Sequence, residues 1–275
     1  MPEPDWYEPG HWRSDPIWQS LAEVAAGPGR QATIREGEDC LTLPGLLDLA
    51  LRIAGGLRAA GVTPGGAVIV QSRNGIDAYA ALLACQSQGF VAIPLPPMFS
   101  PAQVRAVVAS SGAMALVLLE GGAEAMLVEL AAHPCSLKVV FTPEPLPWSP
   151  HLLLRSWVDG CRGAAPLPAD APAPDEDAIV LYSSGSTGAP KGVVHSGNSL
   201  RFAAESLGRL HGVVPGDRVL VALEFGFVGG TILGALTALL AGADVVLMRH
   251  WDAVQCLMLI ESQRISYTLL MPTHC

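Results

Sequence analysis

The sequence predicts an α/β fold with two mainly parallel sheets covered by helices, and three observations support this class. Short apolar runs rich in Val, Ile and Leu alternate with longer helical patterns along most of the chain, as in parallel strands joined by crossover helices. Half of the 275 residues are apolar and 15% are charged, which provides enough apolar material for large cores. A proline-rich segment interrupts the alternation at residues 143–177, and this break predicts a boundary between two subdomains.

The first subdomain is predicted to cover residues 1–142, including an N-terminal arm before the first helix. Asp15 and Pro16 are a typical N-cap and first-turn proline, and they predict that a helix begins there. In residues 44–60 the apolar positions recur at the helical spacing i, i+3, i+4 and i+7. The expected helices cover 16–26, 44–60, 76–88, 100–110 and 123–132, and the expected strands cover 67–71, 90–95, 114–119 and 137–141.

Residues 143–177 contain eight prolines and are predicted to form a surface connector with one short helix around 152–159. The second subdomain is predicted to cover residues 178–275, where strands and helices alternate again. Its expected strands cover 178–182, 191–195, 218–222, 244–248 and 266–270, and its expected helices cover 199–210, 228–241 and 252–263.

Composition narrows the choice of partners and location. The net charge is −9 and the 16 basic residues are scattered, which argues against nucleic acid as a partner. The N-terminus shows no secretion signal and the six cysteines show no C-x-x-C spacing, so we expect reduced thiols in a cytoplasmic protein.

Residues 225–243 are uncharged and as long as a membrane span. Their glycines, and the β-like run that starts at Asp244, favour a buried helix between strands, so no membrane span is predicted.

The stretch YSSGSTGAPKG, residues 182–192, is the strongest candidate for a functional site. It differs from the Walker phosphate loop, because Lys191 lies between Pro190 and Gly192 and because an apolar run follows instead of a helix. Its glycines, Gly192 included, allow positive φ angles that bring backbone N–H groups close to an anion, while its hydroxyls and Lys191 add donors. A solvent-exposed hairpin loop is the alternative. The candidate phosphate ligands are Ser183, Ser184, Gly185, Ser186, Thr187, Gly188 and Lys191.

The segment LYSSGSTGAPKGVVHS closely resembles the phosphate-loop signature of the AMP-forming acyl-CoA synthetases, which are part of the adenylate-forming superfamily. QSQGFVAIPLPPMFSPAQ, VVPGDRVLVALEFGFVGG and ISYTLLMPT are similar to other blocks of that family in the same order, and the resemblance runs from about residue 20 to the end. It implies ATP and Mg²⁺ as ligands, with Thr187 as a metal contact. It also implies a carboxylic acid substrate, activated as an acyl-adenylate and transferred to the thiol of CoA or of phosphopantetheine on an acyl or peptidyl carrier protein.

The resemblance extends to a substrate pocket but assigns no catalytic residue. LEFGFVGG lacks the histidine that the family often has beside its acyl pocket, which leaves Phe225 and Phe227 as candidate pocket residues. Packing in an ordinary core is the alternative for both phenylalanines. His195 closes an apolar strand without a legible acid or nucleophile partner, so we do not expect it to act as a general base.

Several blocks of the family pattern do not occur in the sequence, namely the adenine and ribose blocks and the C-terminal domain with its adenylation lysine. The resemblance therefore implies a truncated N-terminal part of an acid–thiol ligase that is inactive alone, with a separate C-terminal half as a candidate partner. A non-catalytic nucleotide-binding or scaffold remnant of the family is the alternative. The sequence does not identify the acid.

Overall fold

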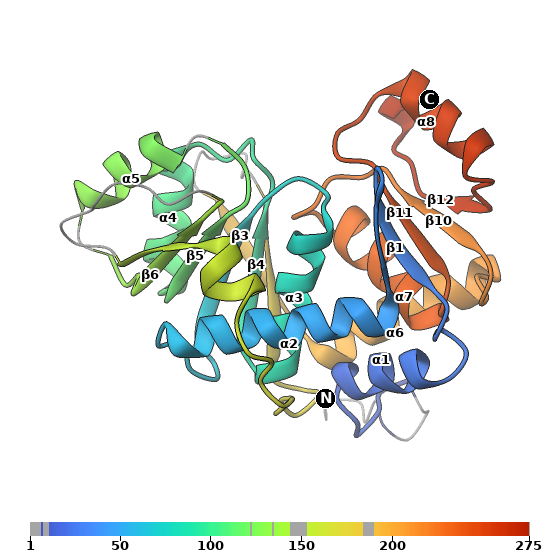
Figure 1. Ribbon diagram of the computed structural model, residues 1–275, viewed down its shortest axis with the longest axis horizontal. Helices are drawn as coiled ribbons and strands as arrows, with labels where there is room; N and C mark the ends of the chain where they lie inside the picture. Colours follow the sequence, from blue (N-terminus) through green and yellow to red (C-terminus); the bar gives the residue numbers. More distant parts are fainter. Residues whose placement is uncertain are drawn as a thin grey trace, which may run out of the picture.

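The computed structural model describes residues 7, 11–121, 123–133, 135–143, 153–183 and 190–274. These residues form two sheets with helices on their faces (Figure 1), which confirms the predicted α/β class. A helix layer between the two sheets contains α3, which contacts β3 and β4 of one sheet and β1 of the other. The largest core cluster lies in this layer and joins the two sheets into one body.

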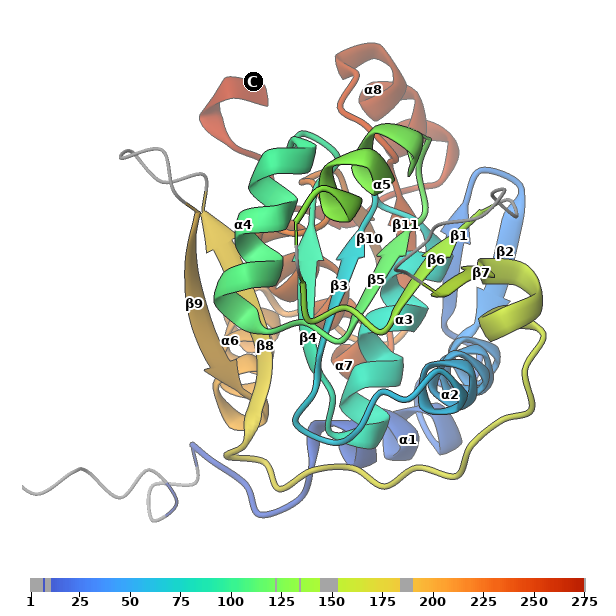
Figure 2. The same ribbon diagram turned by 90° about the vertical axis from the view of Figure 1, so that its left-hand side faces the viewer.

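The larger sheet has seven strands in the order β7-β6-β5-β3-β4-β8-β9 (Figure 2). Its neighbouring strands are parallel except β8 and β9, which form an antiparallel hairpin at one edge. The strands are β3 (Ala67–Gln71), β4 (Val91–Leu95), β5 (Ala115–Leu118), β6 (Val139–Thr142), β7 (Leu153–Ser156), β8 (Asp177–Ser183) and β9 (Lys191–Ser196).

The smaller sheet has five strands in the order β12-β10-β11-β1-β2. β1 and β2 form an antiparallel hairpin, and the other neighbouring pairs are parallel. The strands are β1 (Thr33–Glu36), β2 (Asp39–Thr42), β10 (Arg218–Val221), β11 (Asp244–Leu247) and β12 (Tyr267–Thr268).

The helices that cover these sheets begin and end close to their predicted positions. α4 is one example: Ser100 and Gln103 form a reciprocal capping box at its start, and a left-handed glycine follows its end. The α-helices are α1 (Ile17–Ala26), α2 (Leu43–Ala59), α3 (Ile76–Gln88), α4 (Pro101–Ser111), α5 (Ala123–Ala131), α6 (Gly197–His211), α7 (Thr237–Ala241) and α8 (Ala253–Ser262). Two π-helical segments, η1 (Val158–Arg162) and η2 (Gly229–Leu236), and a 3₁₀ turn, η3 (Pro272–His274), complete the elements.

The proline-rich segment contains a strand where a helix was predicted. Residues 153–156 form β7, which extends the parallel sheet beside β6, and the π-helical turn η1 follows it. The hairpin β1–β2 was not predicted either. Its strands have four residues each and carry several polar side chains, so they give little apolar periodicity.

Each sheet contains strands from both sides of residues 143–177. β8 and β9 follow this segment but complete the seven-stranded sheet, whereas β1 and β2 precede it and belong to the five-stranded sheet. The division between the sheets therefore does not coincide with the division of the sequence into 1–142 and 178–275. Parallel pairing explains this distribution of strands, because the pairing is set by tertiary contacts between distant segments, such as Ile34 with Val245.

Candidate functional site

The predicted phosphate loop connects β8 to β9, which pair as an antiparallel hairpin. β8 runs parallel to β4, so its last residue, Ser183, lies at the carboxyl edge of the seven-stranded sheet. Lys191, the first residue of β9, pairs with Ser183 directly across the hairpin, and both residues are exposed. The structure therefore brings together the first and the last of the predicted phosphate ligands. The others, Ser184, Gly185, Ser186, Thr187 and Gly188, lie outside the described residues.

Gly192 has a different role from the one predicted for it. It lies within β9 and is not among the glycines with a positive φ angle. A Cβ atom at this position would lie 2.7 Å from Cγ1 of Val180 and 2.9 Å from Cζ of Tyr182. The hydroxyl of Tyr182 lies 3.0 Å from Oγ of Ser110 on α4, which fixes the ring. Glycine is therefore required because the side chains of β8 occupy the space beside it.

The carboxyl edges of the two sheets meet at Asn74, three residues after β3. Asn74 is 1% exposed. Its Nδ2 donates hydrogen bonds to the carbonyl oxygens of Leu223 and Met248, both at 2.9 Å, and of Val221 at 3.3 Å. These carbonyls belong to the ends of β10 and β11 and to the loop that follows β10. A side chain that follows a strand of the larger sheet thus satisfies backbone carbonyls at the carboxyl end of the smaller sheet.

The loop after β10 carries the two candidate pocket residues. Phe225 is fully buried and packs edge-on against the ring of Tyr79, with 5.4 Å between the ring centroids, whereas Phe227 is half-buried. The hydroxyl of Tyr79 donates to Oδ1 of Asn74 at 3.0 Å, and it also lies 3.3 Å from the carbonyl oxygen of Gly230. Burial raises the pKa of Tyr79, which keeps this hydroxyl protonated as a donor. The packing of Phe225 agrees with the core alternative that the sequence left open.

The segment that contains this loop forms a turn followed by one continuous helical stretch over 228–241, in which η2 leads directly into α7, as predicted for these residues. In the described part of the chain, no helix is both long enough and apolar enough to cross a bilayer.

A charged cluster lies at the same edge and links the sheets a second time. Arg249, in the loop after β11, pairs with Glu36 at the end of β1 and with Glu120, just after β5, the latter at 2.8 Å. Glu36 also accepts a hydrogen bond from the backbone N–H of Ile76, at the start of α3, at 3.0 Å. Cavities of about 260 and 240 Å³ open here, and Glu120 lines both. Ligands of α/β sheets commonly bind at such carboxyl edges.

The positions of the metal-ligating side chains and of His195 bear on the sequence predictions. No group of three or more His, Cys, Asp or Glu side chains in the described ranges is arranged to hold a metal ion. His195 lies at the far end of β9 from Lys191, with its Nδ1 at 3.2 Å from Oγ of Ser199. A hydroxyl neighbour does not make a histidine a base for a reaction at the other end of the strand.

These features define an α/β protein of two helix-covered sheets, with Ser183 and Lys191 at the carboxyl edge of the larger one, the fold of the N-terminal domains of adenylate-forming enzymes. The chain belongs to the AMP-binding enzyme family, whose model matches residues 21–275. The family resemblance predicted from the loop and the later blocks is thereby confirmed.

The similar proteins include ligases and a synthetase. The chain is 30% identical to indoleacetate–CoA ligase of Aromatoleum aromaticum over 252 residues, which cover 90% of this chain and 48% of the ligase. It is 35% identical to pyochelin synthetase PchE of Pseudomonas aeruginosa over 204 residues, which cover 74% of this chain and 12% of the synthetase. The structure of MbtA from Mycobacterium smegmatis superposes with a TM-score of 0.86 at 25% identity, over 98% of this chain and 50% of MbtA. The chain thus spans about half or less of the length of these relatives.

Three structurally important residues outside the phosphate loop were missed in the sequence, two at the carboxyl edge and one at the opposite end of the β8–β9 hairpin. Asn74 and Arg249 each follow a buried apolar strand, a position that could have marked them as edge residues. Asn198 could not be recognised from local sequence, because its hydrogen-bond partners Asp175 and Arg13 are 23 and 185 residues away in the chain.

Proposed function

We propose that this chain is the N-terminal part of an ATP-dependent, AMP-forming carboxylate ligase that holds the phosphates of ATP at the β8–β9 hairpin. The observation that carries this proposal is the pairing of Ser183 with Lys191 across the base of the glycine-rich loop, at the carboxyl edge of the sheet. A hydroxyl and an ammonium group held on opposite strands provide two donors to one polyphosphate chain.

In the proposed reaction, a carboxylate oxygen of the substrate attacks the α-phosphorus of ATP. The bond from this phosphorus to the oxygen that bridges to the β-phosphate breaks, and acyl-adenylate and pyrophosphate form. Lys191 neutralises charge on the β- and γ-phosphates, and the loop orients pyrophosphate as the leaving group. A thiol then attacks the acyl carbon, which yields a thioester and AMP.

Magnesium would be held at the same loop. Mg²⁺ prefers oxygen ligands and keeps several waters, so one hydroxyl together with the substrate phosphates is a sufficient set. Thr187 is the residue proposed for this contact, with Ser184, Gly185, Ser186 and Gly188 completing the phosphate cradle. The bound ion supplies charge neutralisation at the phosphates.

The acid and the acceptor are proposed only as chemical classes. Similarity to a protein named indoleacetate–CoA ligase and to one named pyochelin synthetase supports a carboxylic acid as substrate and either CoA or a carrier-protein thiol as acceptor. Phe227, half-buried in the loop after β10, is the better placed of the two pocket candidates, because Phe225 is fully enclosed. A reaction that consumes ATP and uses reduced thiols fits the cytoplasm.

We also propose that the described chain is inactive alone and needs the family's remaining segments, in the same polypeptide or as a separate half. α8 presents Val254, Leu257 and Met258 at helical spacing, each more than 60% exposed. β12, at the edge of the smaller sheet, has only two residues. Exposed apolar surface beside a short edge strand is typical of a face that another segment covers.

The proposal is tested by labelling lysines, because Lys138 and Lys191 are the only two in the sequence. MgATP should protect Lys191 from an amine-reactive reagent, whereas Lys138, whose Nζ donates to the carbonyl of Gly61, should react equally with and without nucleotide. In the enzyme completed by the missing segments, Lys191→Ala should weaken ATP binding by roughly 1–3 kcal/mol, the scale of a lost charge-assisted contact. Lys138→Ala is the matched control. Equal ATP affinity in the two variants would contradict the assignment.

A further inference from the structure

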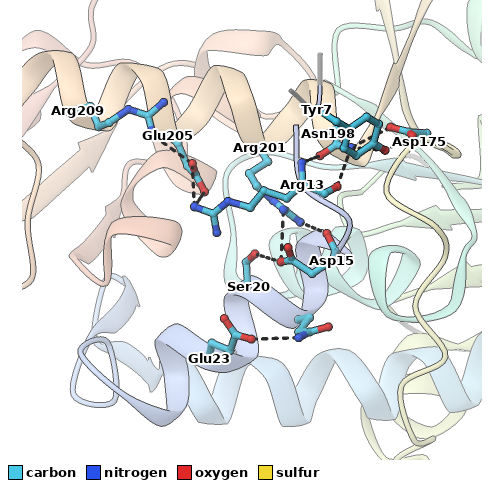
Figure 3. A network of polar contacts seen from close by, with 11 residues as sticks. Tyr7, Arg13, Asp15, Ser20, Glu23, Asp175, Asn198, Arg201, Glu205 and Arg209 are labelled. Atoms are coloured by element: carbon cyan, nitrogen blue, oxygen red, sulfur yellow. Dashed lines mark hydrogen bonds and ion pairs between the residues drawn. The ribbon is translucent and has the colours of Figure 1, made fainter. Parts of the chain in front are cut away.

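The N-terminal arm, residues 11–16, crosses the base of the β8–β9 hairpin, where a polar network holds it (Figure 3). Asn198, in the first turn of α6, is 1% exposed. Its Oδ1 accepts a hydrogen bond from the backbone N–H of Arg13, and its Nδ2 donates to the carbonyl oxygen of the same residue, both at 3.0 Å. Nδ2 also donates to Oδ1 of Asp175 at 2.8 Å, and the backbone N–H of Asn198 donates to the carbonyl of Pro174 at 2.8 Å. One buried residue therefore joins the arm, the segment entering β8 and the segment leaving β9.

Arg201, one turn further along α6, holds the arm a second time. Its side chain is 2% exposed and forms an ion pair with Asp15, with 3.3 Å between Nη1 and Oδ2, while its Nη2 donates to the carbonyl oxygen of Asp15. Asp15 also accepts a hydrogen bond from Oγ of Ser20 at 3.0 Å, so its carboxylate is oriented by α1 instead of capping it. Burial lowers the pKa of Arg201, and the charge of Asp15 opposes this change. Removal of the arm would leave a buried guanidinium without its counterion, which is strongly unfavourable.

The hairpin is attached to the rest of the sheet close to this network. We define the hairpin base as residues 174–179 and 195–198. β8 pairs with β4 at a single position, Ala92 with Ile179, and a register irregularity lies between Asp177 and Ile179. β9 is the outer strand, and four of its six residues are exposed. Nearer the tip, β8 is held by the packing of Leu181 and Tyr182 in the core, whereas the exposed residues of β9, Lys191 included, pair with β8 alone.

We propose that Asn198 is a positioning residue for the nucleotide loop: with the N-terminal arm that it holds, it fixes the hairpin base and thereby the placement of Lys191 at the opposite end. The part of this proposal that concerns nucleotide binding by Lys191 rests on the proposed function. The coupling between the hairpin base and its tip does not depend on that function. Two antiparallel strands that pair along their length move together, so freedom at the base becomes displacement at the tip. The contact of Tyr182 with Ser110 and the burial of Leu181 hold β8 nearer the tip.

The test is amide hydrogen exchange in the 275-residue chain, followed separately at the hairpin base and at its tip, residues 180–183 and 191–194. Asn198→Asp places a second carboxylate against Asp175, whose Oδ1 lies 2.8 Å from the original Nδ2. We expect exchange at the tip to become about tenfold faster, while exchange in β3 stays unchanged. Adding Asp175→Asn restores a donor to the pair, so the double variant should return to within about threefold of the original rate. A general loss of stability would also accelerate amide exchange in β3, and Asp175→Asn would not restore the original rates.

Two further variants keep the result decisive. Asp175→Ala changes an exposed residue and removes its contacts with Asn198 and Tyr7, so it should accelerate the tip in the same direction without unfolding the chain. Arg209→Ala is the control on the same helix, since Arg209 is exposed and pairs with Glu205 outside the base. Acceleration confined to the base in Asn198→Asp, or tip exchange unchanged in both Asn198→Asp and Asp175→Ala, would overturn the proposal.

Nucleotide protection separates this inference from the proposed function. The MgATP concentration that half-protects Lys191 from an amine-reactive reagent should rise about tenfold in Asn198→Asp and return toward its original value when Asp175→Asn is added. If the tip loosens but half-protection stays the same, Asn198 does not position the loop and the inference fails. If MgATP protects Lys191 in no variant while the tip loosens as expected, the proposed function fails and the coupling between base and tip stands.

Discussion

Replacing Asn74 by alanine should destabilise the whole chain, because this one side chain connects the carboxyl edges of both sheets. Its Nδ2 has two protons directed at the carbonyls of Leu223 and Met248, each at 2.9 Å, and its Oδ1 accepts from the hydroxyl of Tyr79 at 3.0 Å. Three hydrogen bonds at about 1 kcal/mol each give a loss of about 3 kcal/mol. Their partners are buried around a residue that is 1% exposed, so water does not replace the lost contacts.

Urea unfolding measures this loss. With a slope of about 3 kcal/mol per molar urea, the midpoint should fall by about 1 M while the slope stays the same. Gln103→Ala is the control, because it removes one exposed hydrogen bond of the capping box of α4 and should cost about 1 kcal/mol or less. A loss below about 1 kcal/mol for Asn74→Ala would refute the view that Asn74 joins the two sheets.

Two further predictions concern helix packing and pH. Gly56→Ala in α2 should destabilise by roughly 1–3 kcal/mol, because its Cβ would lie 2.2 Å from the carbonyl oxygen of Gly160. Gly208→Ala in α6 should stabilise by about 0.5–1 kcal/mol, since its nearest neighbour would be 3.6 Å away, and urea midpoints that move in the same direction would contradict this pair. Burial raises the pKa of Cys85 from 9.0 to about 12, so the unfolded chain ionises first and the free energy of unfolding should fall as pH rises from about 9 towards 12. Cys85→Ala should reduce the difference between unfolding free energies measured at pH 7.5 and pH 10, and an identical difference would contradict the prediction.

Local sequence signals were sufficient for most of the fold. The periodicity of residues 44–60 predicts α2 within a residue at each end, and Ser100 marks the start of α4. They were insufficient for β1, whose four residues include Thr33, Arg35 and Glu36 and whose parallel partner lies more than 200 residues away. Short polar strands obtain their stability from distant partners, and no local pattern reports those partners.

The candidate site was predictable in part for the same reason. The sequence predicts a strand on each side of the glycine-rich run and offers a hairpin loop only as the alternative interpretation, whereas the antiparallel pairing that sets Ser183 opposite Lys191 is seen in the structure. Asn74 and Arg201 depend instead on which segments meet in space. Arg201 follows Leu200 in a helix with an amphipathic sequence pattern, which does not show that the guanidinium is buried. Its burial is explained by the ion pair with Asp15, which is distant in the sequence.

The geometry of the hairpin matters more in this protein because its overall charge works against the proposed ligand. With a net charge of −9, the chain repels a polyphosphate at long range. Exposed charges act over roughly 8 Å at physiological ionic strength, so attraction has to come from groups in direct contact. β9 returns as a strand after the loop, so no helix N-terminus adds its dipole there, and Lys191 is the cation that the motif itself supplies. A single short-range cation is effective only when its position is fixed. The buried contacts of Asn198, at the other end of the same strands, meet this requirement in our proposal because they fix the hairpin base.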